Sequence, residues 1–339
     1  MDKIRLGRTE LMVSRSGFGA LPIQRLSFED ASQILRKAYD KGINFFDTAR
    51  MYSDSEEKIG YALGDVRGNI IIATKSHAKD KKTLFEHLET SLKNLKTDYI
   101  DIYQLHNPES LPDLNDEEGL YSGLKEARDK GLIRFIGITN HSLDNAIKAS
   151  ESGAYDTVQF PLSSLSAEMD IKLIDICIKN DVGVIAMKAL SGGLITNVSS
   201  TFSFLRQFEN LVPIWGIQRM KELEEFLSLE GNPPVLDGKM WEVINKDRLE
   251  LSGEFCRGCG YCLPCPAGID IPNQARLSLM MARSPYEQFL QDSYKDRMEL
   301  INKCINCGHC KNNCPYKLDT PSLLKKELKK YLDFYKSHK

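Results

Sequence analysis

The sequence contains no run of 18 apolar residues, the length that a membrane-spanning helix requires, and no apolar leader follows the basic residues at its N-terminus. It also lacks an excess of charge of either sign, because 45 Lys and Arg residues are balanced by 47 Asp and Glu residues. A chain with a net charge of −2 has no overall field that would attract nucleic acid or a membrane surface. We therefore expect a soluble, cytoplasmic protein whose substrate is a small molecule, with neither nucleic acid nor a membrane as a partner.

Cysteine is concentrated in one part of the chain, where eight of the nine cysteines lie within residues 256–314. In a chain of 339 residues without a leader, this pattern favours metal ligation in a reducing compartment over disulfides. The cysteines form two sets, each followed by proline: Cys256, Cys259, Cys262 and Cys265, then Cys304, Cys307, Cys310 and Cys314. Zinc ribbons are the alternative, but they usually supply cysteines as separated pairs, so runs of three at this spacing favour [4Fe-4S] clusters.

The two cysteine sets resemble those of bacterial two-cluster ferredoxins, in which the last cysteine of each set binds the cluster held by the other set. Two [4Fe-4S] clusters are thus implied. The resemblance assigns Cys256, Cys259, Cys262 and Cys314 to one cluster, and Cys304, Cys307, Cys310 and Cys265 to the second. Such clusters imply a low-oxygen setting, such as that of an anaerobe.

Residues 17–230 alternate short apolar runs with amphipathic stretches of helical length, which is typical of a parallel sheet. Eight strands are predicted, at residues 16–19, 42–46, 70–74, 100–105, 135–138, 157–160, 183–187 and 211–215. An open doubly wound sheet would need a glycine-rich phosphate turn after its first strand, and residues 17–21 match that turn poorly. We therefore predict an α/β fold: a (β/α)8 TIM barrel, its floor capped by a hairpin at residues 3–14.

The chain is predicted to have four parts. Residues 1–230 form the barrel, and residues 231–254 form a linker, since they open with Gly, Asn and two prolines. Residues 255–320 form a small ferredoxin-like iron-sulfur domain, either α+β or helical. Residues 321–339 form a C-terminal helix, whose apolar face we expect to pack against the barrel.

Four polar residues follow consecutive predicted strands, at the end of a barrel where active sites form: Asp47, Tyr52, Lys75 and His106. Together they describe a mechanism for carbonyl reduction. A tyrosine with a pKa near 10 is a poor acid at neutral pH unless a nearby cation eases the loss of its proton, and Lys75 would supply that cation. Asp47 would hold Lys75 in place, while His106 would orient the substrate oxygen.

With these residues in view, residues 1–228 resemble the aldo-keto reductases. Residues 42–49, with Tyr52 five positions after Asp47, are similar to the most specific signature of that family, and residues 74–75 and 101–106 supply the other two catalytic positions. The resemblance implies the same four catalytic residues and a nicotinamide cofactor. The positions implied to bind this cofactor are Thr139, Asn140 and Gln159 at the carboxamide, Met187 at the ring, Lys188, Leu190 and Gly192 at the diphosphate, Gly216, Ile217 and Gln218 at the adenosine, and Glu225 at the adenine.

The 2′-phosphate of NADPH is normally held in this family by Lys, Ser and Arg, where this sequence has Gly216, Ile217 and Glu222. Arg219 could partly replace this clamp. The implied cofactor is therefore NAD(H) or NADP(H), with NADH favoured.

The fused iron-sulfur domain indicates the ferredoxin-containing branch of the family, whose fusion signature residues 259–266 resemble. A hydride carries two electrons, whereas each cluster accepts one. Three interpretations therefore stay open. The barrel could interconvert a small carbonyl compound and its alcohol while the clusters exchange electrons with a partner protein. It could hold a flavin fed by the clusters, although no flavin motif is present. It could also be a non-catalytic sensing or docking unit.

Overall fold

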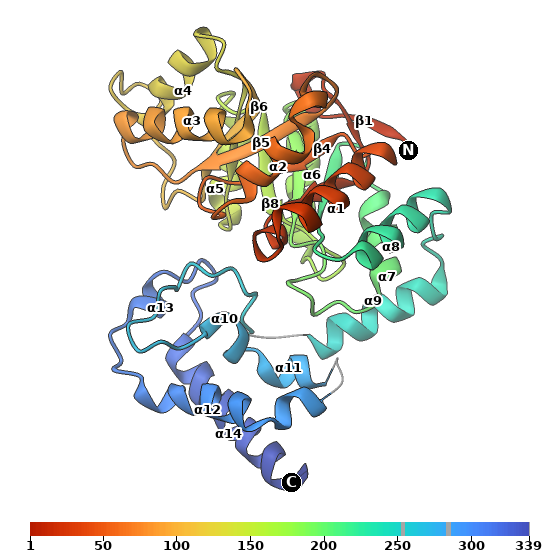
Figure 1. Ribbon diagram of the computed structural model, residues 1–339, viewed down its shortest axis with the longest axis vertical. Helices are drawn as coiled ribbons and strands as arrows, with labels where there is room; N and C mark the ends of the chain where they lie inside the picture. The colour runs from red at the N-terminus through yellow and green to blue at the C-terminus, as the bar shows by residue number, and fades with distance from the viewer. Residues whose placement is uncertain (252–254, 283–285, 339) are drawn as a thin grey trace. The chain divides into compact units, whose positions relative to one another are not determined.

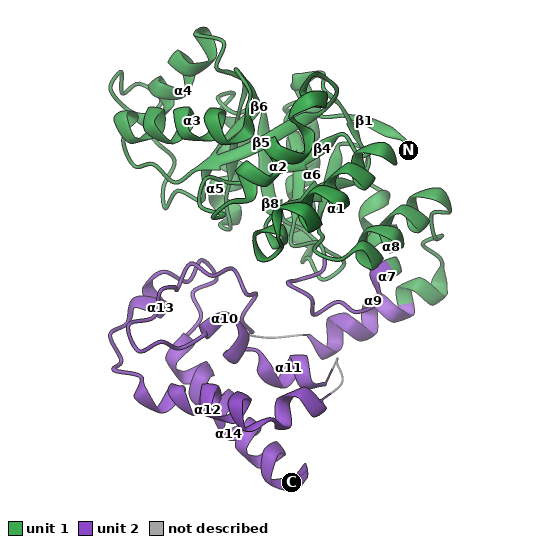
Figure 2. Ribbon diagram, viewed as in Figure 1, with its two compact units in different colours: residues 1–189, 199–241 green, residues 190–198, 242–339 purple. Residues whose placement is uncertain are grey.

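The computed structural model in Figure 1 describes residues 1–251, 255–282 and 286–338. These residues form two compact units (Figure 2). The first unit comprises residues 1–189 and 199–241, and the second comprises residues 190–198 and 242–339.

The first unit is a closed barrel of eight parallel strands, which confirms the predicted (β/α)8 fold. The strands are β3 (Gly17–Gly19), β4 (Phe45–Asp47), β5 (Ile71–Ser76), β6 (Ile100–His106), β7 (Ile133–Thr139), β8 (Thr157–Pro161), β9 (Gly183–Met187) and β10 (Leu211–Gly216). They follow one another around the barrel in chain order, and β10 pairs with β3 to close it. Because helices cover the outside and side chains fill the inside, nearly every strand residue is buried.

Helices alternate with these strands: α1 (Phe28–Asp40), α2 (Ser55–Leu63), α3 (Lys81–Leu95), α4 (Leu120–Asp129), α5 (Leu143–Glu151), α6 (Glu168–Lys179), α7 (Val198–Arg206) and α8 (Met220–Gly231). Short 3-10 turns lie at Gly7–Thr9, Pro22–Arg25 and Gly64–Asn69. Helix α1 shows how the sequence specifies such a helix. The hydroxyl of Ser27 caps it by accepting a hydrogen bond from the Asp30 amide, and buried residues recur at helical spacing from Ala31 to Ala38.

An antiparallel hairpin, β1 (Lys3–Arg5) and β2 (Met12–Ser14), precedes the barrel. Its turn places Leu6, which is completely buried, in the same apolar cluster as the inward-facing residues Phe45, Ile102 and Val212. The amino-terminal end of the barrel is thus closed by a packed side chain, as the sequence predicts.

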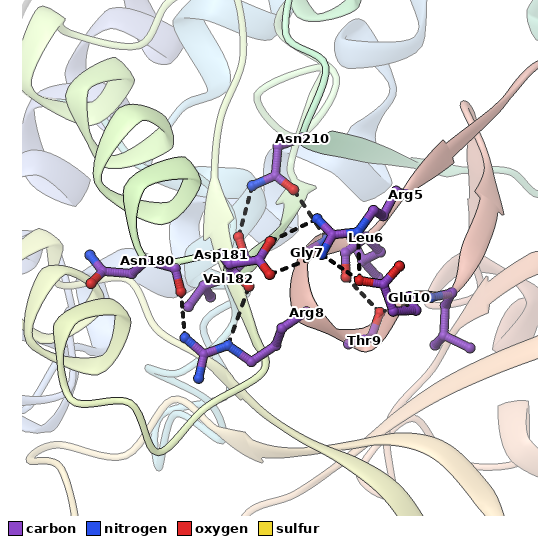
Figure 3. A network of polar contacts seen from close by, with 11 residues as sticks. Arg5, Leu6, Gly7, Arg8, Thr9, Glu10, Asn180, Asp181, Val182 and Asn210 are labelled. Carbon is purple, nitrogen blue, oxygen red and sulfur yellow. Dashed lines mark hydrogen bonds and ion pairs between the residues drawn. The ribbon is translucent and has the colours of Figure 1, made fainter.

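Polar contacts hold this hairpin turn against the segments that lead into β9 and β10 (Figure 3). The backbone amide of Arg8 donates to the carbonyl of Asp181, and the carboxylate of Asp181 accepts two hydrogen bonds from Arg5. Gly7 has φ +52°, and a Cβ atom there would lie 2.2 Å from the amide nitrogen of Gly183. Glycine is therefore required for the hairpin to approach the barrel this closely.

The second unit contains helices joined by irregular loops, and no strand, within the residues that the structure describes. Its helices are α9 (Gly238–Glu250), which begins in the first unit, α10 (Ile271–Gln274), α11 (Leu277–Met281), α12 (Asp292–Glu299), α13 (His309–Asn312) and α14 (Thr320–His338), with 3-10 turns at Glu287–Leu290 and Leu300–Lys303. Apolar residues of α14 form its core together with residues such as Leu277, Phe289 and Met298. The hydroxyl of Tyr331 donates to the carbonyl of Phe289 at 2.8 Å, which joins this helix to the rest of the unit.

Residues 231–254, predicted as a linker, contain helix α9 over most of their described length, and the chain passes from the first unit to the second within this helix, between Trp241 and Glu242. The C-terminal helix buries its apolar face in the core of the iron-sulfur unit, whereas we expected it to pack on the barrel. Its hydrophobic periodicity predicts burial but does not identify the partner surface. None of the helices in the described ranges is long and apolar enough to cross a membrane.

Candidate active site and cluster-binding cysteines

A buried lysine and a buried aspartate lie at the centre of the carboxyl-terminal end of the barrel. Asp47 ends β4, Lys75 lies in the neighbouring strand β5, and they are 2% and 1% exposed. The Lys75 ammonium donates to the Asp47 carboxylate and to the carbonyl of Thr48, both at 2.6 Å. Burial lowers the pKa of Lys75, and the neighbouring carboxylate opposes this shift. The pair places a positive charge where water is excluded.

Tyr52 and His106 lie beside this pair. The Lys75 ammonium is 5.5 Å from the centre of the Tyr52 ring, and the rings of Tyr52 and His106 meet edge to face with centroids 5.9 Å apart. Burial, and then the charge of Lys75, lower the pKa of His106 well below its usual 6.5. This imidazole is therefore neutral at neutral pH. The structure thus brings all four predicted catalytic residues together.

Gln104 belongs to the same network, although sequence reasoning gave it no role. Its amide nitrogen donates to the side-chain oxygen of Gln159 at 3.0 Å and reaches the Asp47 carboxylate at 3.4 Å. Gln159 also donates to Asp47, at 3.5 Å. A signal was available, because Gln104 is two residues before His106 in a strand, and alternate residues share a face. A polar residue on the inward face of a barrel strand is costly unless it is hydrogen-bonded.

The positions predicted to hold the nicotinamide carboxamide are neighbours in the barrel. Thr139 and Gln159 are paired in register across β7 and β8, and the Thr139 hydroxyl lies 3.7 Å from the sulfur of Met187 in β9. Asn140 differs, since its side-chain amide donates to the carbonyl of Pro108 at 2.9 Å. Thr139, Gln159 and Met187 together form a buried polar and polarisable edge that fits a nicotinamide ring.

The remaining predicted cofactor positions are spread over both units. Lys188 directly follows β9, whereas Leu190 and Gly192 belong to the segment 190–198 of the second unit. Gly216 ends β10 and is exposed, and Ile217, which comes next, is completely buried. A ligand could therefore contact Ile217 only through its backbone. Gln218 is partly exposed and Glu225 is exposed in α8.

Arg219, the cation expected to help bind a 2′-phosphate, is bound to a carboxylate. Its guanidinium donates to Glu222 at 2.8 and 2.5 Å. The other carboxylate oxygen of Glu222 accepts hydrogen bonds from the backbone amides of Gln218 and Arg219. Glu222 thus caps helix α8 and neutralises Arg219.

Cysteines from both sets lie close together in the second unit. One cavity of the second unit is lined by Cys265, Cys304, Cys307 and Cys310, the set assigned to one cluster, together with Cys262. Cys256 is buried, and the nearby thiols of Cys259 and Cys314 add to the effect of burial in raising its pKa. Cys314 is therefore near the first set although it is far from it in the sequence. Thiol side chains are the donors that [4Fe-4S] clusters use, so the chemistry of these residues fits iron-sulfur clusters of this kind.

Glycines shape the cluster-binding loops. Gly258, Gly260 and Gly308 have φ of +63°, +85° and +76°, a region in which other residues are strained. Each follows directly after, or two residues after, a cysteine of the sets. The tight spacing of the cysteines thus depends on left-handed backbone at these positions.

Comparison with known proteins agrees with this geometry. The family model described as "Aldo/keto reductase family" matches residues 16–230, and the model described as "4Fe-4S dicluster domain" matches residues 255–319. The chain belongs to the aldo/keto reductase family and carries a 4Fe-4S dicluster domain at its C-terminal side.

Individual relatives match the barrel. "Aldo-keto reductase YhdN" of Bacillus subtilis is 30% identical over 216 residues, which cover 58% of this chain and 64% of that protein, less than two thirds of its length. "NADH-specific methylglyoxal reductase" of Escherichia coli is 29% identical over 226 residues, 58% of this chain and 69% of that protein. The holo form of "aldo-keto reductase AKR11C1" from Bacillus halodurans has a TM-score of 0.64 at 20% identity, covering 73% and 96% of the two chains, which supports the fold.

The barrel end also contains His141, whose protonation should affect stability. This side chain is 6% exposed, and its backbone amide donates to the side chain of Asn107. Burial, with the charge of Lys188, lowers the pKa of His141 to about 3. The unfolded chain binds a proton at this imidazole below about pH 6.5, but the folded chain does not until about pH 3. His141 therefore makes the barrel less stable as the pH falls from about 6.5 towards 3.

We expect His141→Asn to weaken this pH dependence. Between pH 7.5 and pH 5, the wild type should lose about 2 kcal/mol of unfolding free energy through this one group, a loss that the variant escapes. Urea unfolding followed by tryptophan fluorescence measures the barrel alone, because the two tryptophans, Trp215 and Trp241, both lie in the first unit. The control His338→Gln, at an exposed histidine, should keep the wild-type slope. Equal slopes for wild type and His141→Asn would contradict the assignment.

Proposed function

We propose that the barrel interconverts a small carbonyl compound and its alcohol, with Asp47, Tyr52, Lys75 and His106 as its catalytic residues. The observation that carries the proposal is the buried contact between Lys75 and Asp47 beside the Tyr52 ring. Burying a cation beside a tyrosine costs free energy of folding. Such an arrangement is typical of a site where the tyrosine has to lose its proton.

The chemistry follows from the positions of these groups. A reduced nicotinamide, when bound, supplies a hydride to the carbonyl carbon. The Tyr52 hydroxyl donates its proton to the carbonyl oxygen, and Lys75 stabilises the tyrosinate that is left. Asp47 keeps Lys75 in position, and the neutral imidazole of His106 orients the oxygen by a hydrogen bond without adding charge. The reverse reaction uses the same groups to remove the proton of the alcohol.

We propose NADH as the preferred cofactor. The side chain of Glu222 adds negative charge where the 2′-phosphate of NADPH would lie, and it already binds Arg219. Thr139, Gln159 and Met187 are proposed to contact the nicotinamide, and Lys188, Leu190 and Gly192 the diphosphate. Asn140, Gly216, Ile217, Gln218 and Glu225 complete the proposed set.

We further propose that the dicluster domain holds two [4Fe-4S] clusters, which exchange single electrons with a partner protein in a reducing, low-oxygen cytoplasm. Electrons should pass through the cluster of Cys304, Cys307, Cys310 and Cys265. In this set Cys307 is exposed and only Cys310 is buried, and the neighbouring Ile305, which lines the same cavity, is 68% exposed. In the other set Cys256 and Cys262 are buried and no cysteine is exposed. Electron transfer between proteins requires a cofactor near the surface, and an exposed apolar side chain beside it suits a transient contact.

Tyr52→Phe should lower the turnover of carbonyl reduction at least a hundredfold, because it removes the proton donor and leaves the ring in place. The measurement is anaerobic NADH oxidation with a panel of aldehydes and ketones that includes methylglyoxal, the compound named for one relative. NADH binding, followed by its fluorescence, should be unchanged. Tyr61→Phe, at an exposed tyrosine of α2, serves as the matched control. Undiminished turnover of Tyr52→Phe would overturn the catalytic assignment.

Glu222→Gln should shift the cofactor preference towards NADPH by about tenfold in kcat/KM, because it releases Arg219 and removes a negative charge. Glutamine keeps an oxygen that can accept the backbone hydrogen bonds of the helix cap. Thermal unfolding of the variant checks this cap. Arg219→Gln, which removes the cation itself, should not gain NADPH activity. A Glu222→Gln variant with the wild-type preference would show that the 2′-phosphate binds elsewhere.

Absorbance and electron paramagnetic resonance spectra of anaerobically purified protein test the cluster proposal. Two [4Fe-4S] clusters per chain should be reduced by dithionite, with no flavin bands between 350 and 500 nm after the clusters are removed by acid. Flavin bands would favour the alternative in which clusters feed a flavin in the barrel. Intact clusters without turnover of any carbonyl compound would instead favour a sensing or docking role.

A further inference from the structure

Arg276 joins two loops of the second unit that are distant in the sequence. It directly precedes α11, and its Nη1 donates to the carbonyl of Gly192 at 2.8 Å. On its other side, the guanidinium lies against Gly258, in the loop of Cys256. A Cβ atom at Gly258 would come within 2.9 to 3.0 Å of three guanidinium atoms. One cation thus contacts both the segment 190–198 and a cluster-binding loop.

Both loops are shaped to admit this side chain. Gly192 and Gly258 have φ of +70° and +63°, and a Cβ atom at Gly192 would lie 2.6 Å from Nη1 of Arg276. The Nε atom of Arg276 is buried, with no hydrogen-bond partner among the described residues. An arginine with no specific contacts would lie at the surface with its N–H donors hydrogen-bonded to water. Holding a guanidinium here, at the cost of a buried donor, indicates a use for its charge.

The guanidinium of Arg276 lies against Gly258, two residues after Cys256, so its positive charge is held at the loop that carries this proposed cluster ligand. Positive charge near a cluster ligand stabilises the additional negative charge that the cluster acquires on reduction. The same guanidinium holds the carbonyl of Gly192, a position that we propose to contact the cofactor diphosphate.

We propose that Arg276 is a positioning residue that couples the redox state of the cluster bound by Cys256 to dinucleotide binding at the segment 190–198. This inference rests on the proposed cofactor site. One electron added to the cluster strengthens the attraction between the cluster and Arg276. This weakens the hydrogen bond from Arg276 to the carbonyl of Gly192. A bound diphosphate, in turn, makes reduction of the cluster less favourable. Coupling between two equilibria is reciprocal, so each must change the other by the same factor.

ADP-ribose is a suitable probe, because it carries the diphosphate and adenosine but no nicotinamide and therefore cannot transfer a hydride. We expect the anaerobic holoprotein to bind ADP-ribose about tenfold more weakly after one-electron reduction by dithionite. Saturating ADP-ribose should accordingly lower the midpoint potential of this cluster by about 59 mV, the equivalent of tenfold for a one-electron couple. Isothermal titration calorimetry and a redox titration followed by electron paramagnetic resonance measure the two sides independently.

Arg276→Gln should reduce both effects to less than twofold while the clusters remain bound. Arg276→Lys keeps the charge and most of the volume, so it should retain part of the coupling, about threefold, and it covers the case in which the glutamine variant fails to assemble its clusters. Arg257→Gln is the matched control. Arg257 is also next to Cys256 in the sequence, but its guanidinium lies over the rings of Phe255 and Tyr316, 4.7 and 4.6 Å from the ring centres.

The outcomes separate this inference from the proposed function. ADP-ribose binding to wild-type protein with no redox dependence, or full coupling in Arg276→Gln, would overturn the role of Arg276 alone. Equal loss of coupling in Arg257→Gln would also overturn it, because any nearby positive charge would then suffice. If neither ADP-ribose nor NADH bound the wild type, the proposed dinucleotide site would be wrong, and the inference would fall with it.

Discussion

The hydrogen bond between Lys75 and Asp47 is the contact on which the proposed chemistry of the barrel depends. Neither charge could be buried alone, since an unpaired ion in the protein interior costs several kcal/mol. The two residues come from adjacent strands, so the pair forms only if the parallel register of β4 and β5 is correct. Gln104 and Gln159, from β6 and β8, complete the surroundings of Asp47. The barrel thus keeps the ammonium group of Lys75 away from water and beside Tyr52.

Much of this arrangement could be predicted from the sequence, for a physical reason. Parallel strands are buried on both faces, so they appear as short apolar runs, and polar residues at their ends stand out. The eight strands and the convergence of Asp47, Tyr52, Lys75 and His106 follow from that contrast. Gln104 did not stand out, because it lies inside a strand, where only its parity with His106 marks it as facing inward.

Other features depend on tertiary contacts that leave no local signal. Helix α14 has the periodicity of a helix with one buried face, but the same pattern would suit any apolar partner. Helix α9 follows a proline-rich opening that is typical of a linker. Arg276 belongs to no motif at all, and its position next to Gly192 joins residues 84 positions apart in the sequence. The role proposed for Arg276 can be recognised only from its contacts with both Gly192 and Gly258 in the folded chain.

The fused domain raises a question of charge as well as of electron number. Hydride addition followed by protonation of the oxygen leaves a neutral alcohol, whereas one-electron reduction adds one negative charge to a cluster. The segment 190–198 belongs to the compact unit of the clusters although the chain returns to the barrel after it. The proposed clusters would therefore act on a cofactor bound there through their charge, whether or not electrons pass between them. In such an arrangement the clusters need not reduce the substrate at all. Their redox state can set how tightly the dinucleotide binds, which would resolve the mismatch between one-electron and two-electron chemistry without a flavin.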